Sequence, residues 1–455
     1  MTQFDADSMH RLAKLALDAG EASTPEEAIA LFQGYRVRIH LGKGWASSLA
    51  GQACFLTALN TATRAFLGGV EVTGDLSPLL RVPLFAGRNA AQVVQELGGT
   101  PVATPTSTLP TVLIGEGPLP QAAAFAVRTT WDAWCAQVAP ISDANHLPMC
   151  EDNPIAGMAA GALAVSELFS HVRGDSLEAG CRRLGVSLWD PLAVVDWHEP
   201  AYRGPTLTYL PDRLWLVGLG HLGQAYAWAL AMLPYPAQRR PRLLLQDFDK
   251  VAPSNVSTCL LVGAADLGFR KTRVVAQRLE EIGFEIELVE RRFAAHHRLQ
   301  SDEPTVALFG VDNINARRDL DTAAFDLVVE AGLGSGYRDF RSIRLHTLPG
   351  AKLASELWPA SATSQRATAL NATYKALAQS RGDLCGVTTL ASKAVATPFV
   401  GAFAASLVIA ELLRPLHGGN NCDSIDLQMQ TLAHRLGAVA ASTPGRCAFI
   451  ESTDP

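Results

Sequence analysis

A glycine-rich loop between an apolar strand and an apolar helix constrains the fold of this chain more than any other feature. Residues 214–217 form a short apolar run, and three glycines follow it with the spacing G-x-G-x-x-G, namely Gly218, Gly220 and Gly223. A helix is predicted for residues 223–233, and a second apolar strand for residues 242–245. This order of strand, loop, helix and strand predicts a β-α-β unit with parallel strands.

The same alternation continues toward the C-terminus. Helices are predicted at residues 271–282 and 316–324, and strands at residues 305–309 and 327–329. Strands that alternate with helices indicate an α/β fold with a doubly wound, mostly parallel, Rossmann-like sheet. Ligands of such sheets bind beyond the carboxyl ends of the strands, so we look for chemistry in the residues that follow each strand.

The N-terminal half repeats motifs of the C-terminal half in the same order. One helix opens with Asn153-Pro154 and closes with Glu167-Leu168, and its counterpart opens with Thr397-Pro398 and closes with Glu411-Leu412 at equal spacing. Three further pairs match: residues 109–115 with 303–310, 51–53 with 223–225, and 87–99 with 268–283. General α/β patterning is the alternative explanation, but four ordered matches favour two tandem copies that form a pseudo-dimer.

The two copies differ in the residues that carry chemistry. The second copy has Val311-Asp312-Asn313 after a core strand, where the first copy has Glu116-Gly117. The first copy's Gly42-x-Gly44 loop is separated from its helix by an insertion. Pro and Gly cluster around residues 200–211, so the boundary is placed there. We predict an inactive domain at residues 1–205 and an active domain at residues 206–455.

Charge and cysteine spacing exclude several classes of protein. The 455 residues carry a formal net charge of −6, which does not favour binding to a nucleic-acid backbone. The eight cysteines include no C-x-x-C pair, which argues against a disulfide framework and a structural zinc site. The N-terminus has no signal-peptide pattern, so we expect a cytoplasmic protein.

Two strongly apolar stretches are predicted to be buried core helices and not membrane spans. Residues 155–169 are too few to span a bilayer, and residues 394–413 contain Pro398 and Glu411. Trp131 and Trp134 are spaced for one helical face, and we expect them in the core or at a domain interface.

The glycine loop alone is a weak signal for nucleotide binding. An acidic residue after the second strand, Asp247, strengthens it, because its carboxylate could accept hydrogen bonds from ribose hydroxyls. A nicotinamide-dependent dehydrogenase would have both features. The motifs that follow do not suit a dehydrogenase; they are Asp247-Phe248-Asp249, Ser254-Asn255, Arg270-Lys271, and Asp312-Asn313 with Arg317.

In these motifs the sequence resembles the adenylation domain of ubiquitin-activating enzymes and of their ThiF- and MoeB-like bacterial relatives, which activate sulfur carriers. The resemblance covers roughly residues 214–418. It implies that Asp312 binds magnesium and that Lys271 and Asp312 take part in catalysis. It further implies that ATP is bound by Gly218, Gly220, Gly223, Asp247, Asp249, Asn255, Lys271 and Arg317. Adenylation joins two anions, a carboxylate and the α-phosphate, so such a site needs fixed cations.

One position departs from the family pattern. The family has an Arg-Gln pair three and four residues after the Asn, where this chain has Thr258 and Cys259. Another cation must therefore replace the missing guanidinium. The candidates are Arg270, Arg273, Arg317 and Arg318, together with Arg11, because the partner domain can supply an arginine in this family.

Cys385 lies in a segment that resembles the crossover carrying the thioester-forming cysteine of ubiquitin-like activating enzymes. It follows the region of the last predicted strands and precedes the helix that begins at Pro398. Gly386 and polar Thr388-Thr389 favour a flexible, exposed loop, in which a thiolate could attack an acyl-adenylate. A buried structural cysteine is the alternative, and Cys259 and Cys422 are the other candidate nucleophiles.

The resemblance implies an enzyme that uses ATP and Mg²⁺ to adenylate the C-terminal glycine of a ubiquitin-like protein. Cys385 would take the acyl group as a thioester and deliver it to a conjugating enzyme. A sulfur-carrier adenylyltransferase without a thioester and a non-catalytic nucleotide-binding scaffold are the alternatives. Neither nucleic acid nor a membrane is expected as a partner, and bacterial antiviral defence is suggested only by analogy with the family.

Overall fold

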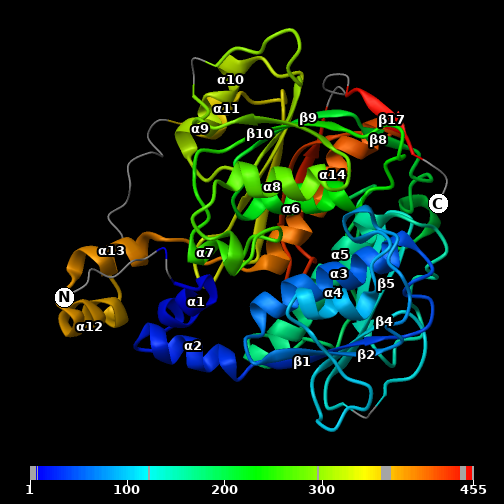
Figure 1. The fold of residues 1–455 in the computed structure, drawn as a ribbon, viewed down its shortest axis with the longest axis vertical. Coiled ribbons are helices and arrows are strands. Elements are labelled where there is room, and N and C mark those ends of the chain that lie inside the picture. Colours follow the sequence, from blue (N-terminus) through cyan, green and yellow to red (C-terminus); the bar gives the residue numbers. More distant parts are fainter. Residues whose placement is uncertain are drawn as a thin grey trace.

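Two sheets with matching strand order organise the molecule (Figure 1). The computed structural model describes residues 7, 9–120, 123–294, 297–359, 370–440 and 447–452. The first sheet has the order β3-β2-β1-β4-β5-β6-β7. Its strands are β1 (Arg36–Leu41), β2 (Gly69–Gly74), β3 (Thr100–Pro101), β4 (Thr111–Ile114), β5 (Ala126–Asp132), β6 (Cys135–Pro140) and β7 (Leu184–Ser187).

The second sheet repeats this arrangement with the order β11-β10-β9-β12-β13-β14-β15-β16. Its strands are β9 (Arg213–Val217), β10 (Arg242–Gln246), β11 (Glu285–Val289), β12 (Val306–Phe309), β13 (Leu327–Leu333), β14 (Ser342–Leu348), β15 (Cys422–Gln428) and β16 (Arg435–Val439). In each sheet the first five strands of the order pair in parallel with their neighbours, and each later strand pairs antiparallel with the strand before it in the order. This confirms the predicted α/β fold with two tandem copies. A small separate sheet pairs β8 (Tyr209–Pro211) with β17 (Phe449–Glu451).

The helices follow the same repeat. In the first copy they are α3 (Leu49–Ala65), α4 (Ala90–Glu96) and α5 (Pro154–Arg173), and their counterparts in the second copy are α6 (His221–Met232), α8 (Lys271–Glu280) and α14 (Pro398–Leu416). Three of the four motif pairs matched in the sequence fall on these helix pairs, and the fourth falls on the corresponding strands β4 and β12. Helices α3, α5, α6 and α14 pack together between the two sheets (Figure 1), so the copies meet as a pseudo-dimer.

Matching glutamines show how closely the copies correspond. Gln224 Oε1 accepts a hydrogen bond from Leu261 N at 3.1 Å, and its Nε2 donates to Leu219 O at 3.0 Å. Gln52 Oε1 accepts from Arg81 N at 2.6 Å, and its Nε2 donates to Ala46 O at 3.0 Å. Each side chain is fully buried. Both glutamines therefore join the loop before their helix to the segment that follows the second strand of their copy.

The two apolar helices α5 and α14 are long and hydrophobic enough to cross a membrane by length and composition alone. In this fold, however, 89% of the most apolar stretch of each helix is buried inside the protein. A side chain at Gly157 of α5 would place its Cβ 2.0 Å from the carbonyl oxygen of Ala50 in α3. Glycine thus permits the close approach of these helices, as expected for core helices.

Helices α1 (Arg11–Ala19) and α2 (Pro25–Gln33) belong to the first half of the sequence and contact both copies, since Phe32 of α2 stacks on Phe169 of α5 in the first copy (Figure 1). They lie beside α12 (Ala372–Arg381) and α13 (Leu384–Ser392) of the crossover between β14 and α14. Lys14 Nζ pairs with Asp18 at 2.7 Å, and the Tyr374 hydroxyl of α12 donates to Asp18 at 2.6 Å. Glu26 of α2 pairs with Arg381 at 2.6 Å. The N-terminal helices are therefore anchored to the crossover.

Several sequence expectations were wrong in detail. The helix predicted at residues 316–324 is two short helices, α9 (Ile314–Arg318) and α10 (Leu320–Ala323). Trp131 and Trp134 are buried as expected, but they lie at the β5–β6 hairpin and not on a helix. Strands β15 and β16 follow α14, so the crossover precedes the last strands of the sheet. The remaining short helices of the described ranges are α7 (Pro253–Val256), α11 (Ala354–Leu357), η1 (Pro83–Phe85), η2 (Pro200–Tyr202) and η3 (Ala264–Asp266).

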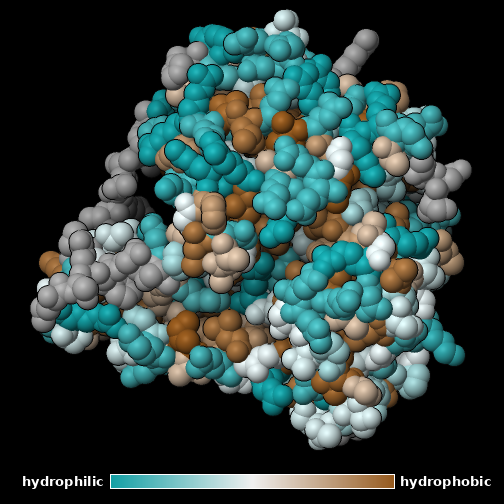
Figure 2. Space-filling view, in the orientation of Figure 1, coloured by the Kyte–Doolittle hydropathy of each residue, from teal (hydrophilic) through white to brown (hydrophobic). Residues whose placement is uncertain are grey.

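The face drawn in Figure 2 is mostly hydrophilic, with apolar residues gathered in small groups, one of them beside α7. Exposed large apolar side chains include Phe248 and Phe269, which are 36% and 63% exposed. Phe248 follows β10 and Phe269 precedes α8, so both belong to the second copy.

Candidate functional site

The glycine loop of the second copy joins β9 tightly to α6. Gly218 has a φ of +84°, and a Cβ there would lie 2.6 Å from Val311 Cγ1. A Cβ at Gly223 would lie 1.7 Å from the carbonyl oxygen of Gly218. Gly220 is the N-cap of α6 and provides no side-chain cap. The first turn of α6 therefore keeps backbone N–H groups that could bind an anion such as a phosphate.

Asp247 follows β10 and fixes the glycine loop. Its side chain is 8% exposed, and its Oδ2 accepts a hydrogen bond from Leu219 N at 2.6 Å. Its Oδ1 accepts from Asp249 N at 2.8 Å. A carboxylate oxygen can accept two hydrogen bonds, so both oxygens retain capacity for a ribose hydroxyl.

Lys271 begins α8 and lies beside the two aspartates. Its Nζ is 3.2 Å from Asp249 Oδ2, and its side chain is 9% exposed. Burial by itself would lower the Lys271 pKa, but the charges of Asp247 and Asp249 raise the pKa above its ordinary value. Lys271 is therefore a fixed cation at neutral pH, near the glycine loop.

Asn255 lies on α7, in the segment that follows β10. Its Oδ1 accepts a hydrogen bond from Ala252 N at 2.9 Å, which closes the turn at the start of α7. Thr258 and Cys259, which stand where the family has Arg and Gln, are buried. Neither side chain is a cation, so this segment supplies no positive charge at the position of the family arginine.

Asp312 follows β12 and is exposed. The next residue, Asn313, caps α9 by accepting hydrogen bonds from Asn315 N at 2.9 Å and Ala316 N at 3.4 Å. Because β12 is the parallel neighbour of β9, Asp312 and the glycine loop lie at the same edge of the sheet. Among the described residues no group of three or more His, Cys, Asp or Glu side chains could hold a metal ion.

Arg317 of α9 makes its contacts with the protein itself. Its guanidinium donates to Val311 O and Ala331 O at 3.1 Å each, and its Nε lies 3.3 Å from Glu330 Oε2. These contacts join the loop that carries Asp312 to β13. A nucleotide contact by Arg317 stays a prediction.

Arg11 of α1 reaches this edge of the second copy from the N-terminal segment. Its guanidinium donates to Ser254 Oγ at 3.3 Å, and its backbone N–H donates to Ser257 Oγ at 3.3 Å. Burial lowers the Arg11 pKa, while Asp7, Cys259 and Asp312 oppose that shift through their charge. Its Nη1 is buried and has no hydrogen-bond partner. Arg11 is thus a cation that contacts the segment lacking the family arginine, and its charge interacts with that of Asp312.

The other candidate arginines are less well placed. Arg270 donates to the Phe248 carbonyl, and Arg273, whose side chain is 69% exposed, pairs with Glu290 at 3.0 Å. The Nε of Arg318 is buried without a hydrogen-bond partner, but no described contact joins this side chain to the glycine loop or to Asp312. Among these arginines the described contacts therefore favour Arg11.

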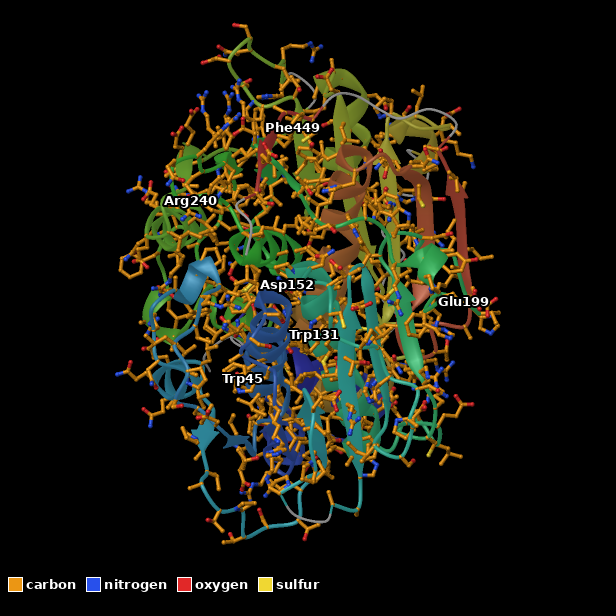
Figure 3. The ribbon with its side chains drawn as sticks, turned by 90° about the vertical axis from the view of Figure 1, so that its right-hand side faces the viewer. Trp45, Trp131, Asp152, Glu199, Arg240 and Phe449 are labelled. Carbon is orange, nitrogen blue, oxygen red and sulfur yellow. The ribbon has the colours of Figure 1, made fainter. Side chains whose placement is uncertain are left out.

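The corresponding loop of the first copy is filled by the protein itself. The carboxylate of Asp152 accepts hydrogen bonds from Leu49 N at 2.8 Å and Ala50 N at 2.6 Å, in the first turn of α3. Ser48 Oγ accepts a third bond, from Gly51 N at 3.0 Å. Figure 3 labels Asp152 with Trp45 and Trp131, whose atoms also surround Gly51. The backbone N–H groups in the first turn of α3 thus have side-chain hydrogen-bond partners, whereas α6 has no side-chain cap.

A second contact closes the first-copy loop. Lys43 N donates to Glu116 O at 2.6 Å, and Glu116 N donates to Lys43 O at 2.9 Å. The loop after β1 is therefore paired with the residues after β4, where the second copy carries Asp312. Asp152 was not among the residues predicted from the sequence, although it directly precedes the repeated Asn153-Pro154 motif.

The structure differs from the sequence expectation at the crossover. Cys385 lies in α13 and not in a loop. The description of the structure does not extend to the Cys385 side chain. Cys259 and Cys422 are buried, and burial raises the pKa of each thiol, which disfavours both as nucleophiles.

Two family models match the chain, one in each half. The BilD N-terminal domain matches residues 36–188, and the BilD C-terminal domain matches residues 210–419. A relative from Collimonas sp. (strain OK412), the bacterial E1-like protein BilD, is 43% identical over 431 residues, which cover 94% of this chain and 93% of the relative. The chain belongs to the BilD family of bacterial E1-like proteins. Membership in this family agrees with the resemblance to E1-like adenylation domains.

The solved structures that match the chain share less sequence with it and cover about half of it. Escherichia coli MccB with MccA-N7isoASN is 13% identical, with 51% of this chain and 66% of MccB covered and a TM-score of 0.32. MccB with ATP is 12% identical, with 52% of this chain and 66% of MccB covered and a TM-score of 0.32. E. coli tRNA N6-threonylcarbamoyladenosine dehydratase, TcdA, is 16% identical, with 46% of this chain and 86% of TcdA covered and a TM-score of 0.31.

Proposed function

We propose that this protein uses ATP and Mg²⁺ to adenylate the C-terminal carboxylate of a small ubiquitin-like protein with a terminal glycine. The observation that carries the proposal is the contrast between the copies. In the second copy an uncapped glycine loop lies beside Asp247 and Lys271, with Arg11 near Asp312. In the first copy Asp152 fills the equivalent loop.

Each group of residues would have a separate role in adenylation. The glycine-loop N–H groups would bind phosphate, and Asp247 would accept hydrogen bonds from the ribose, with Asp249 and Asn255 shaping the surrounding segment. Lys271 and Arg11 would hold the negative charge that develops when the carboxylate oxygen attacks the α-phosphorus and pyrophosphate leaves. Arg11 would take the place of the Arg that the family has at the position of Thr258, while Lys271 keeps the role that the family resemblance implies.

Asp312 fits a magnesium ion that is bound mainly by the nucleotide. Mg²⁺ is commonly held by one or two carboxylates together with substrate phosphates, and Asp312 is a single exposed carboxylate at the edge where the glycine loop lies. The ion would neutralise phosphate charge. This arrangement requires no cluster of protein ligands.

In the second step, the Cys385 thiolate would attack the acyl carbon, and AMP would leave with the electron pair of the broken bond. The resulting thioester would pass to a conjugating enzyme. The segment that carries Cys385 is joined to the ATP-binding edge through α1, because Lys393 pairs with Asp7 at 2.8 Å and Asp7 pairs with Arg11 at 3.4 Å.

A second candidate function is adenylation without a thioester, followed by transfer to a sulfur donor. It is favoured because two of the three candidate nucleophiles, Cys259 and Cys422, are buried with raised thiol pKa values, which leaves only Cys385 for a thioester. A thiol-sensitive adduct between the protein and its carrier on a non-reducing gel would exclude this candidate.

ATP–pyrophosphate exchange with the cognate carrier tests the proposal. Asp312→Ala should lower the exchange rate about a hundredfold, as the loss of one charge-stabilising group commonly does. Asp302→Ala makes the same change at an exposed position that precedes β12 and should leave the rate unchanged. Exchange at the wild-type rate in Asp312→Ala would remove Asp312 from the site.

A further inference from the structure

Residues 256–262 of the second copy are held by side chains of the first copy. This segment begins directly after Asn255 and contains Thr258 and Cys259, which replace the family's Arg-Gln pair. Arg64, in the last turn of α3, donates to the carbonyl oxygens of Val256 and Val262, the latter at 3.1 Å. One guanidinium group thus binds both ends of the segment.

Asn60 completes this contact from the preceding turn of α3. Its Nδ2 donates to the carbonyl oxygen of Leu260 at 3.0 Å, inside the segment. Its Oδ1 accepts a hydrogen bond from Arg64 Nε at 3.0 Å, which fixes the guanidinium. Asn60 is 1% exposed. The two side chains form a rigid brace, which we call the α3 brace and define as Asn60 and Arg64.

The segment is joined in turn to the glycine loop. Leu261 N donates to Gln224, and Gln224 donates to Leu219 O. Leu219 N donates to Asp247 at 2.6 Å. An unbroken series of hydrogen bonds therefore runs from the α3 brace in one copy to the carboxylate that we assign to the ribose in the other.

This brace exists in one direction only. Asn60 and Arg64 lie nine and thirteen residues after Gly51, and the residues at the same distances after Gly223 are Met232 and Pro236. Neither of these side chains has a hydrogen-bond donor. Packing between the copies alone would not require this difference, whereas support for a single ATP site would.

We infer that Asn60 and Arg64 are positioning residues that hold residues 256–262, and through them the glycine loop, in the ATP-binding conformation. The inference rests on the proposed function and adds a role for the copy that has lost its own site. Removal of Arg64 would leave two carbonyl groups without their donors and would free the segment that carries Asn255. ATP affinity should then fall even where the fold is retained.

The test is calorimetric titration of the full chain with ATP and magnesium, which requires no carrier protein. Arg64→Met keeps the length of the side chain without its donors and should weaken ATP binding about tenfold. Arg64→Lys restores one charged donor and should recover part of the affinity. In steady-state exchange, the change should raise the KM for ATP and leave kcat nearly unchanged, which general destabilisation would not do.

Arg182→Met is the matched control. Arg182 also donates from the first copy to a carbonyl of the second, that of Gln430, in another part of the interface. This variant should bind ATP as the wild type does. If Arg64→Met does not fold, Asn60→Ala, which removes only the donor to Leu260 and the support of Arg64, replaces it, and thermal unfolding of each variant shows which proteins are comparable.

Wild-type affinity in a folded Arg64→Met or Asn60→Ala protein would overturn the inference and leave the proposed function intact. An equal loss of affinity in Arg182→Met would also overturn it, since any contact between the copies would then serve. If the wild type itself binds no ATP, the proposed function fails, and the inference fails with it.

Discussion

Replacement of Asp152 tests whether the first copy fills its own glycine loop. The Asp152 carboxylate accepts two hydrogen bonds from the first turn of α3, where the positive end of the helix dipole favours a negative charge. Loss of a capping side chain costs about 1 kcal/mol, and loss of the charge at the helix start adds up to about 1 kcal/mol. Bonds to a charged group are worth about 1.5–3 kcal/mol each and are not additive. We therefore expect Asp152→Ala to lower the free energy of unfolding by about 2–3 kcal/mol.

Differential scanning calorimetry measures this effect. One kcal/mol shifts the Tm of a domain of about 150–250 residues by about 2–4 °C, so the unfolding of the first copy should shift by about 4–12 °C in Asp152→Ala. Asp152→Asn keeps one acceptor oxygen and should lose about half as much. Ser48→Ala, which removes the cap on Gly51 in the same helix, gives the scale for a single neutral bond. A Tm within 1 °C of the wild type in Asp152→Ala would refute the reasoning.

Four further outcomes are expected. Calorimetry should find one ATP per chain, and should still do so in Asp152→Ala, because the Lys43–Glu116 pairing remains; two equivalent sites in the wild type would contradict the assignment of an inactive copy. Lys271→Ala should lower pyrophosphate exchange about a hundredfold through loss of the fixed cation, and an unchanged rate would exclude Lys271 from the site. Cys385→Ala should retain exchange but form no thiol-sensitive adduct with the carrier, and an adduct that persists would place the thioester on another cysteine. Burial lowers the pKa of His10 and of His221 to about 4, so the folded protein resists the protonation that the unfolded chain accepts below about pH 6.5. The contribution of these histidines to the free energy of unfolding should therefore be complete above about pH 6.5 and be lost as the pH falls toward about 4. Urea midpoints compared at about pH 7.5 and about pH 5 should depend less on pH in His221→Gln than in the wild type.

The repeat could be predicted because its signals are local and appear twice. Glu167 and Glu411 were matched on spacing alone, and the structure supplies the reason for the spacing. Both carboxylates are buried, and each accepts a backbone N–H from the chain that follows the helix, Gly180 N at 2.8 Å and Cys422 N at 3.0 Å. A buried acceptor at the end of a core helix is needed in both copies, so the same residue occurs in both.

The composition of the candidate site could be predicted only within one copy. Asp247 and Asp312 follow strands of the second sheet and Lys271 begins the helix α8 between two of its strands, so the topology of this copy brings them to one edge. Arg11 was one of five candidate arginines, since sequence distance carries no information about which helix crosses between the copies. Asn60 and Arg64 gave no signal, because a donor to a backbone carbonyl leaves no motif in the segment that accepts the bond.

Short periodic patterns were misleading where the chain reverses. Trp131 and Trp134 are three residues apart, which is compatible with one face of a helix. The chain instead turns at Ala133, which has a φ of +49°, and both rings become buried from a hairpin. In the same way, Gly386 and two threonines suggested a loop at Cys385, but Asp383 caps α13 by accepting from Gly386 N at 2.8 Å.

The one-way brace between the copies has a consequence for how such a chain can change over time. In a dimer of identical subunits every substitution appears twice, so a residue that serves the neighbouring subunit must also be tolerated at its own site. Once the two copies are joined in one chain, this constraint is lifted. Met232 of α6 and Pro236, which follows α6, can be selected for their own copy, while Asn60 and Arg64 are selected for the other copy. Each half is then free to specialise, but neither half alone retains all the residues that the proposed ATP site would use.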